Sequence, residues 1–257
     1  MPGGVRRVLR PDDAPLLVIV AHPDDETIGA GVLLARSKNP WILHATDGAP
    51  RDPAFVARGF SGTLQEYATV RRKELEAAMA LAGIGPERLR SLGIADQEAV
   101  FEIPRLVHEI AASIQDLAPK TVLTHAYEGG HPDHDALALA TRLAVDRLPE
   151  PPELFEMALY HAGSIGEFLP GPPVTRQEIS EEERDLKRRM IACFETQQET
   201  LAAFLPPRNE AFRPAPVYDF TKPPHAGPLQ YELWGFGMTG AQWLRRCRSW
   251  KPATGGS

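Results

Sequence analysis

The fold is decided by the stretch LLVIVAHPDDE, residues 16–26, in which an apolar run passes directly into a polar corner. A second stretch, TVLTHAYEGGHPDH at residues 121–134, repeats the plan, so the chain carries two related tetrads, His22-Pro23-Asp24-Asp25 and His131-Pro132-Asp133-His134. Proline disfavours helical conformation in the residue before it and fits the first position of a helix. Each tetrad is therefore predicted to open a helix, with Asp24 and Asp133 second and Asp25 and His134 third.

Short β-rich runs alternate with longer helical patterns along the rest of the chain. This alternation is typical of an α/β protein with a mostly parallel sheet covered by helices. Strands are predicted at residues 16–21, 41–46, 89–94, 121–125 and 154–160. Helices are predicted at 64–82 with Gly83 as the C-cap, at 106–117, and from the capping box Ser180-x-x-Glu183 through Leu201. We expect a single domain over residues 1–257.

Proline is frequent, with 25 residues in all, and it crowds into two segments, 149–173 and 206–228. Neither segment can be regular structure throughout, because proline lacks a backbone donor and fixes its own φ. The first is interpreted as a connection around the last predicted strand. For the proline-rich C-terminal segment at about 205–230, two interpretations stand: an ordinary surface crossing, or a lid over a site.

Composition excludes several classes of protein. The net charge of −6 argues against a nucleic-acid binder, which needs clustered Lys and Arg for phosphate contacts. Cys193 and Cys247 lie far apart, so neither a disulfide framework nor a thiolate zinc site is indicated. The start of the chain does not read as a signal peptide, and the longest apolar run, residues 16–21, is about a third of the ~20 residues that a membrane span needs. We expect a cytoplasmic protein with no membrane partner; the sequence indicates no oligomeric state.

The two tetrads concentrate three His and three Asp where parallel strands end, which is the edge at which α/β sheets bind ligands. A mixed nitrogen and oxygen set favours zinc, or another first-row divalent ion, over magnesium or calcium. A catalytic zinc keeps three protein ligands and an open position. A spare carboxylate would then serve as general base and a spare His as a donor to the oxyanion or the leaving group, as in a hydrolase. Spacing alone does not show which of the six residues are metal ligands, which is the general base and which is the donor.

Other readings of these polar residues remain open. Acids in the first helical turn, Glu26 included, gain typically ~0.3–1 kcal/mol each from the helix dipole without any metal. Asp47, before Gly48, is either a turn former or a group facing the same crevice. Among the other histidines, His125 is the best further candidate, since it precedes the second tetrad on the same strand.

The motif Ala21-His22-Pro23-Asp24-Asp25-Glu26, together with the second tetrad, resembles the paired signature of the PIG-L (LmbE-like) zinc-dependent deacetylases. The pattern Arg71-x-x-Glu74 and the segment from Lys187 through Thr196-Gln197 resemble further parts of that family, with Thr in place of Ser. The resemblance covers about residues 15–200. It implies a three-layer Rossmann-like fold and one zinc ion.

The resemblance also implies roles for single residues. His22, Asp25 and His134 would hold the zinc and Asp24 would be the general base, while His131 would stabilise the oxyanion or protonate the amine, oriented by Asp133. Arg71 and Asp96 fall where the family binds its substrate; the alternative for Arg71 is a solvated helix residue.

The expected reaction is removal of the acetyl group from a small-molecule substrate, an N-acetylated amino sugar of the N-acetylglucosamine type, with release of acetate. The alternatives are hydrolysis of a different amide or of a thiol-sugar conjugate, a phosphoesterase, and a metal-binding module without turnover.

Overall fold

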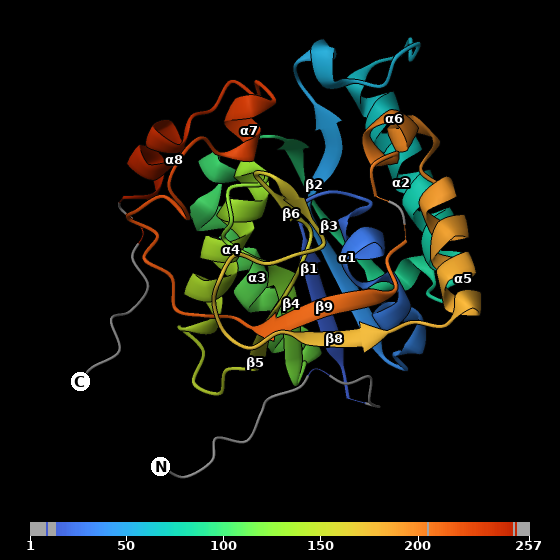
Figure 1. Cartoon of the computed structure of the whole chain (residues 1–257), viewed down its shortest axis with the longest axis horizontal. Helices are drawn as coiled ribbons and strands as arrows, with labels where there is room; N and C mark the ends of the chain where they lie inside the picture. The colour runs from blue at the N-terminus through green and yellow to red at the C-terminus, as the bar shows by residue number, and fades with distance from the viewer. Residues whose placement is uncertain (1–8, 10–13, 205, 249, 251–257) are drawn as a thin grey trace.

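The computed structural model describes residues 9, 14–204, 206–248 and 250. Its centre is a seven-stranded sheet in the order β3-β2-β1-β4-β5-β9-β8 (Figure 1). The strands are β1 (Leu16–Val20), β2 (Pro40–Pro50), β3 (Leu89–Asp96), β4 (Thr121–His125), β5 (Glu153–Met157), β8 (Thr175–Glu178) and β9 (Asn209–Pro214). The first five in chain order are parallel, and β9 pairs antiparallel with both β5 and β8. The predicted α/β class with a mostly parallel sheet is confirmed.

Helices cover both faces of this sheet, which gives three layers (Figure 1). One face packs on α3 (Ile103–Leu117), α4 (Pro132–Val145) and α8 (Gly240–Cys247), and the other on α1 (Asp25–Arg36), α2 (Leu64–Leu81) and α5 (Glu181–Ala192). Strand β1 shows how the layers form, because Leu17 and Ile19 point into the first core while Val18 and Val20 point into the second. A strand buried on both faces reads as a continuous apolar run, and β1 does.

Four predicted helix features agree with the structure. Helix α2 ends before Gly83, which takes a positive φ of 77° as expected of a C-cap, and α3 lies where the apolar periodicity placed it. The capping box at Ser180 and Glu183 is present at the start of α5. Residue Pro132 opens α4 with His131 as its N-cap.

Three predictions about elements are wrong. The single helix expected from Ser180 through Leu201 breaks at Phe194, whose backbone leaves the helical region (ψ 69°) while its side chain is fully buried in the core; the chain resumes as α6 (Gln198–Leu201). The last predicted strand ends at Met157, and Tyr160 belongs to a small hairpin of β6 (Tyr160–His161) and β7 (Ser164–Ile165). The first tetrad does not place Asp24 inside its helix, because α1 begins at Asp25.

Strands β8 and β9 were not predicted at all. Strand β9 lies inside the proline-rich segment 206–228, which is therefore neither a lid nor a surface crossing throughout. Short helix α7 (Gln230–Leu233) follows it. The residues on which the signal-peptide expectation rests lie mostly outside the described residues, and within the described part of the chain no helix is long and apolar enough to cross a membrane.

Candidate metal centre

The two tetrads meet at the carboxyl ends of the neighbouring parallel strands β1 and β4. In the second, His131 is in an extended conformation and its Nδ1 accepts a hydrogen bond from the backbone N–H of Asp133 at 3.1 Å. Since Nδ1 accepts, the ring proton is assigned to Nε2. Burial, with His22 and His134 nearby, holds the pKa of His131 well below its ordinary value, so this imidazole is neutral and its Nε2–H can donate.

The imidazoles of both tetrads form one buried cluster. The ring centroids of His22 and His131 are 4.4 Å apart, and that of His134 lies 5.3 Å from the first and 5.2 Å from the second. Asp25 joins them, with Oδ2 3.2 Å from Nδ1 of His22 and Oδ1 3.2 Å from Nε2 of His134. The predicted ligand set of His22, Asp25 and His134 is thus brought together, around the Asp25 carboxylate.

The donor atoms of this cluster fit a metal ion. Nε2 of His134 is buried without a hydrogen-bond partner, although it faces the Asp25 carboxylate, and buried polar atoms are otherwise nearly always satisfied. Among the residues that the structure describes, three sets of side chains have donor atoms close enough to share an ion: His22, His131 and His134; His22, Asp96, His131 and Asp133; and Asp25, His125 and His134. The predicted ligand set shares two residues with the first of these and two with the third. Imidazole nitrogen with carboxylate oxygen suits zinc and its first-row neighbours.

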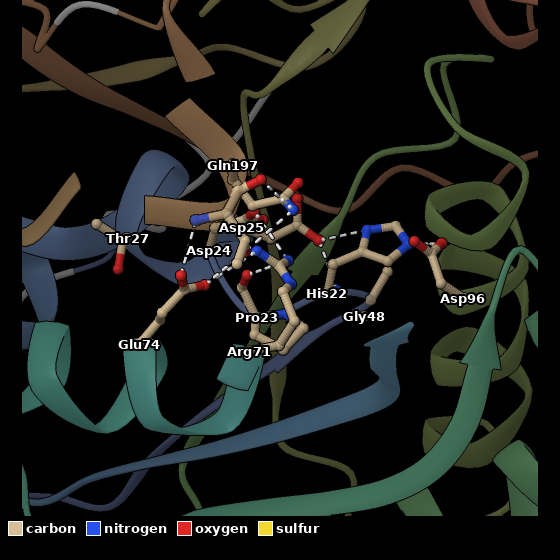
Figure 2. Close-up of polar contacts among 12 residues, drawn as sticks. His22, Pro23, Asp24, Asp25, Thr27, Gly48, Arg71, Glu74, Asp96 and Gln197 are labelled. Carbon is tan, nitrogen blue, oxygen red and sulfur yellow. Dashed lines mark hydrogen bonds and ion pairs between the residues drawn. The ribbon is translucent and has the colours of Figure 1, made fainter. Parts of the chain in front are cut away.

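Asp24 is held apart from this cluster by an unusual backbone. Its φ of 138° and ψ of −30° are strained for a residue with a side chain, at a cost of about 1–3 kcal/mol. Arg71 on α2 fixes the corner, since its Nη2 donates to the carbonyl of Pro23 at 2.6 Å and to Oδ2 of Asp24 at 3.1 Å (Figure 2). Burial raises the pKa of Asp24 to about 7, with Arg71 opposing the rise and Asp25 adding to it. A carboxylate with a pKa near 7 is suited to take a proton.

Arg71 reaches Asp24 through space left by a glycine, and it is itself buried. Gly48, with a φ of 66° in the irregular last part of β2, leaves room that a side chain would occupy, because an added Cβ would lie 2.8 Å from Nε of Arg71 (Figure 2). The arginine itself is only 2% exposed, so the alternative of a solvated helix residue is wrong. Its role in substrate binding stays a prediction.

Asp133 and Asp96 both contact the ring of His22. Asp133 is fully buried; its carboxylate accepts from the backbone N–H of Gln97 at 2.7 Å and of Ala99 at 3.0 Å, and lies 3.2 Å from Nε2 of His22. It stays 4.0 Å from Nδ1 of His131, the ring it was expected to orient. Oδ1 of Asp96 is 3.0 Å from Nε2 of His22, which places this residue against the cluster as well as in the cavity described below.

Sequence reasoning missed the anchor between α2 and the turn after α5. Glu74 accepts from the backbone N–H and the hydroxyl of Thr196, both at 2.7 Å, and Nε2 of Gln197 donates to the hydroxyl of Tyr67 at 2.9 Å. The signal was present, because the residues resembling the family at Arg71-x-x-Glu74 and at Thr196-Gln197 turn out to be partners. Figure 2 shows Glu74 and Gln197 beside Asp24 and Arg71.

The remaining polar candidates divide between site and scaffold. His125 stacks on His134 with centroids 4.0 Å apart, and its Nε2 accepts from the backbone N–H of Ala21. His44 is buried against Glu26 at 3.0 Å. Asp47 accepts from the N–H of Ala49 at 2.9 Å, the contact of a turn former.

A cavity of about 1140 Å³ opens onto His22, Asp24 and His131. Its other walls come from four segments: residues 54–58 after β2, the β6–β7 hairpin, residues 195–204, and the region of α7 from Gln230 to Phe236. The described residues of segment 206–228 do not line it, so the lid interpretation finds no support in the lining.

Comparisons with known proteins agree with this geometry. The family model of PIG-L, described as GlcNAc-PI de-N-acetylase, matches residues 17–145, about half of the chain. A probable N-acetyl-alpha-D-glucosaminyl L-malate deacetylase 2 of Bacillus cereus is 31% identical over 173 residues, covering 65% of this chain and 76% of that protein. A 1D-myo-inositol 2-acetamido-2-deoxy-alpha-D-glucopyranoside deacetylase of Thermobifida fusca is 31% identical over 166 residues, 54% of this chain and 57% of that one.

Solved structures show the same fold. The zinc inhibited form of a teicoplanin deacetylase superposes with a TM-score of 0.62 at 18% identity, covering 80% of this chain and 99% of that one. N,N'-diacetylchitobiose deacetylase from Pyrococcus horikoshii gives a TM-score of 0.56 at 20% identity, with 79% and 84% covered. With the two tetrads, the sheet order and the family match in agreement, the chain belongs to the PIG-L family.

Proposed function

We propose that the protein is a metal-dependent hydrolase that removes the acetyl group from an N-acetylated amino sugar of the N-acetylglucosamine type and releases acetate. The observation that carries the proposal is the separation of two neighbouring acids. Asp25 lies 3.2 Å from imidazole nitrogens on both sides, while Asp24 faces Arg71 with a pKa near 7. A ligand and a general base are thereby adjacent but distinct.

The roles follow from this arrangement. His22, Asp25 and His134 would hold the ion, and zinc is our choice because the donors mix nitrogen with oxygen. A metal in such a site polarises a carbonyl and makes its bound water acidic. Asp24 accepts the proton of the attacking water. The neutral His131 donates its Nε2–H to the carbonyl oxygen as negative charge develops there, or to the departing amine.

The relatives support the substrate class. The two deacetylases of Bacillus cereus and Thermobifida fusca are both named for an acetylated glucosamine unit joined to a second group. A cytoplasmic location, predicted from the sequence, belongs to the same proposal. Hydrolysis of another amide or of a thiol-sugar conjugate on the same centre is the second candidate, favoured by the size of the cavity.

The test is a panel of N-acetylglucosamine conjugates, other acetamides and phosphate esters, assayed for acetate and for phosphate after chelation and again after adding zinc. We expect zinc-dependent acetate release from the amino sugar conjugates. Phosphate release that requires magnesium would instead identify a phosphoesterase, and zinc binding without turnover on any member would identify a binding module.

A further inference from the structure

Five aromatic side chains form a continuous wall of the cavity, here called the aromatic wall: Phe55, Tyr160, Phe204, Trp234 and Phe236. They come from four separate parts of the chain and contact one another in tilted or edge-to-face arrangements. Ring centroids are 4.9 Å apart for Phe55 and Phe236, 5.9 Å for Trp234 and Phe236, 5.2 Å for Tyr160 and Trp234, and 5.6 Å for Tyr160 and Phe204.

The aromatic wall begins at the buried cluster of histidines and extends away from it. Phe236 lies 4.7 Å from the ring of His131, and Tyr160 lies 5.2 Å from the ring of His134. One sugar ring, roughly the size of one aromatic ring, would cover only the part next to the histidines. Phe55, Phe204 and Trp234, whose ring contacts are with other members of the wall, would remain uncovered.

The aromatic wall is partly exposed. Trp234 is 48% exposed, the other four members are partly buried, and two of these, Tyr160 and Phe204, also pack against the hydrophobic core. Large aromatic side chains gain most when their faces are covered, and a contiguous exposed apolar patch is a sign of a binding site. The cavity of about 1140 Å³ also exceeds the roughly 300–1,000 Å³ typical of small-ligand pockets.

The charges of the lining argue against an anionic group beyond the sugar. Of its two arginines, Arg71 already donates to Asp24 and Pro23, and Arg58 is largely exposed and lies 4.0 Å from Glu199. Two acids, Glu195 and Glu199, lie on the same side. A carboxylate or phosphate there would meet more negative than positive charge.

The geometry points to a substrate whose amino sugar carries a large apolar aglycone, one or more aromatic rings in size, that stacks on the aromatic wall. Gln198 and Thr200 line the cavity as well and can form hydrogen bonds with sugar hydroxyls, whereas the Thr196 hydroxyl and the Gln197 amide nitrogen are already bonded to Glu74 and Tyr67. The inference rests on the proposed function for the reaction and extends it to the second half of the substrate.

The experiment compares two N-acetylglucosamine glycosides, one methyl and one 2-naphthyl, on the full chain reconstituted with zinc. We expect kcat/KM for the naphthyl glycoside to exceed that for the methyl glycoside about tenfold, mainly through a lower KM, because the naphthyl ring is buried against the wall. Trp234→Ala should lower this ratio several-fold, and Trp234→Phe should restore most of it, since it keeps an aromatic face.

Phe101→Ala is the matched control, because Phe101 is another aromatic side chain, 47% exposed, that packs on Arg246 and is not part of the lining. It should leave the ratio unchanged. A ratio near one in the native protein would overturn the inference. So would an equal loss on both glycosides in Trp234→Ala, which would assign Trp234 to the sugar or to the fold.

Binding of the naphthyl glycoside to the metal-free protein, measured by calorimetry, separates this inference from the proposed function. If no amino sugar releases acetate but the naphthyl glycoside still binds and Trp234→Ala weakens it about tenfold, the deacetylase proposal fails and the apolar subsite stands. If acetate is released equally well from both glycosides and the Trp234→Ala variant binds the naphthyl glycoside normally, the deacetylase proposal stands and the apolar subsite is excluded.

Discussion

Helix α1 is interrupted at Ala30 (φ −146°, ψ 19°), and a distant acid, Glu210, accepts hydrogen bonds from backbone N–H groups just after the interruption. Glu210 on β9 accepts from the backbone N–H of Val32 and of Leu33, both at 2.9 Å, as an N-cap residue would. Lys187 on α5 donates to the same carboxylate at 2.6 Å, and both side chains are 1% exposed. One buried ion pair thus ties together α1, α5 and β9.

The cost of breaking this pair can be worked out. Lys187→Met leaves the Glu210 carboxylate buried without a cation, and Glu210→Gln leaves the Lys187 ammonium unpaired; each should cost about 3–5 kcal/mol of unfolding free energy. Their sum is about 6–10 kcal/mol. In the double variant no charge remains, and the amide oxygen of Gln can accept only one of the two N–H groups. One unsatisfied donor costs about 1–3 kcal/mol, so the double variant should resemble a single variant or be more stable.

Urea unfolding followed by far-UV circular dichroism on metal-free protein measures these values without linkage to metal binding. Asp185 and Arg188 on the same helix give the matched control, because their 2.8 Å pair is more than half exposed. Asp185→Asn with Arg188→Met should change stability by less than about 1 kcal/mol. If the double variant lost the sum of the unfolding free energies lost in the two single variants, to within about 0.5 kcal/mol, Lys187 and Glu210 would not act as a buried ion pair.

Three further outcomes are expected. Asp24→Asn should keep its metal and lose about 10²–10⁴-fold in kcat, whereas Asp47→Asn, in the irregular last part of β2, should retain activity; near-normal turnover by the first variant would remove Asp24 as the base. His134→Ala should weaken metal binding by more than the ~10–100-fold that an outer-shell partner costs, and full occupancy after dialysis would exclude it as a ligand. Burial raises the pKa of Glu156 to about 8 against the opposing charge of Arg213, so this carboxyl holds in the folded state a proton that it releases near pH 4.3 when unfolded. Unfolding free energy should therefore fall between about pH 4.3 and 8, by up to about 1.4 kcal/mol per pH unit, and Glu156→Gln should flatten that slope in denaturant titrations; an unchanged slope would assign the pH dependence elsewhere.

The parallel half of the sheet could be predicted because each of its strands carries its own signal. Strands β1 and β4 are short apolar runs bounded by polar corners. Strand β8 has the sequence TRQE with alternating partial exposure, and β9 lies among prolines, so neither has a local pattern to detect. Contacts between distant residues hold them instead: Arg213 on β9 pairs with Glu128 and Glu156.

The site was predictable to the extent that its residues are neighbours in sequence. The tetrads gave the cluster of histidines and acids, and the proline rule placed His131 correctly as an N-cap. The partners of Asp133 could not be found in this way, because they are backbone N–H groups of Gln97 and Ala99 that depend on how β3 ends. The aromatic wall was likewise invisible, since four separate segments supply it.

The prediction that Asp24 lies inside the first helix is wrong, and the reason bears on catalysis. If Asp24 had belonged to α1, its side chain and that of Asp25 would project about 100° apart from one rigid helical turn. The direction of the Asp24 side chain would then be fixed by the helix. The strained φ of Asp24 instead directs one carboxylate to Arg71 and the other to His22 and His134. In this conformation Arg71 donates a hydrogen bond to the carbonyl of Pro23, which offsets part of the ~1–3 kcal/mol of strain. The corner thus keeps base and ligand side by side in the chain but apart in space.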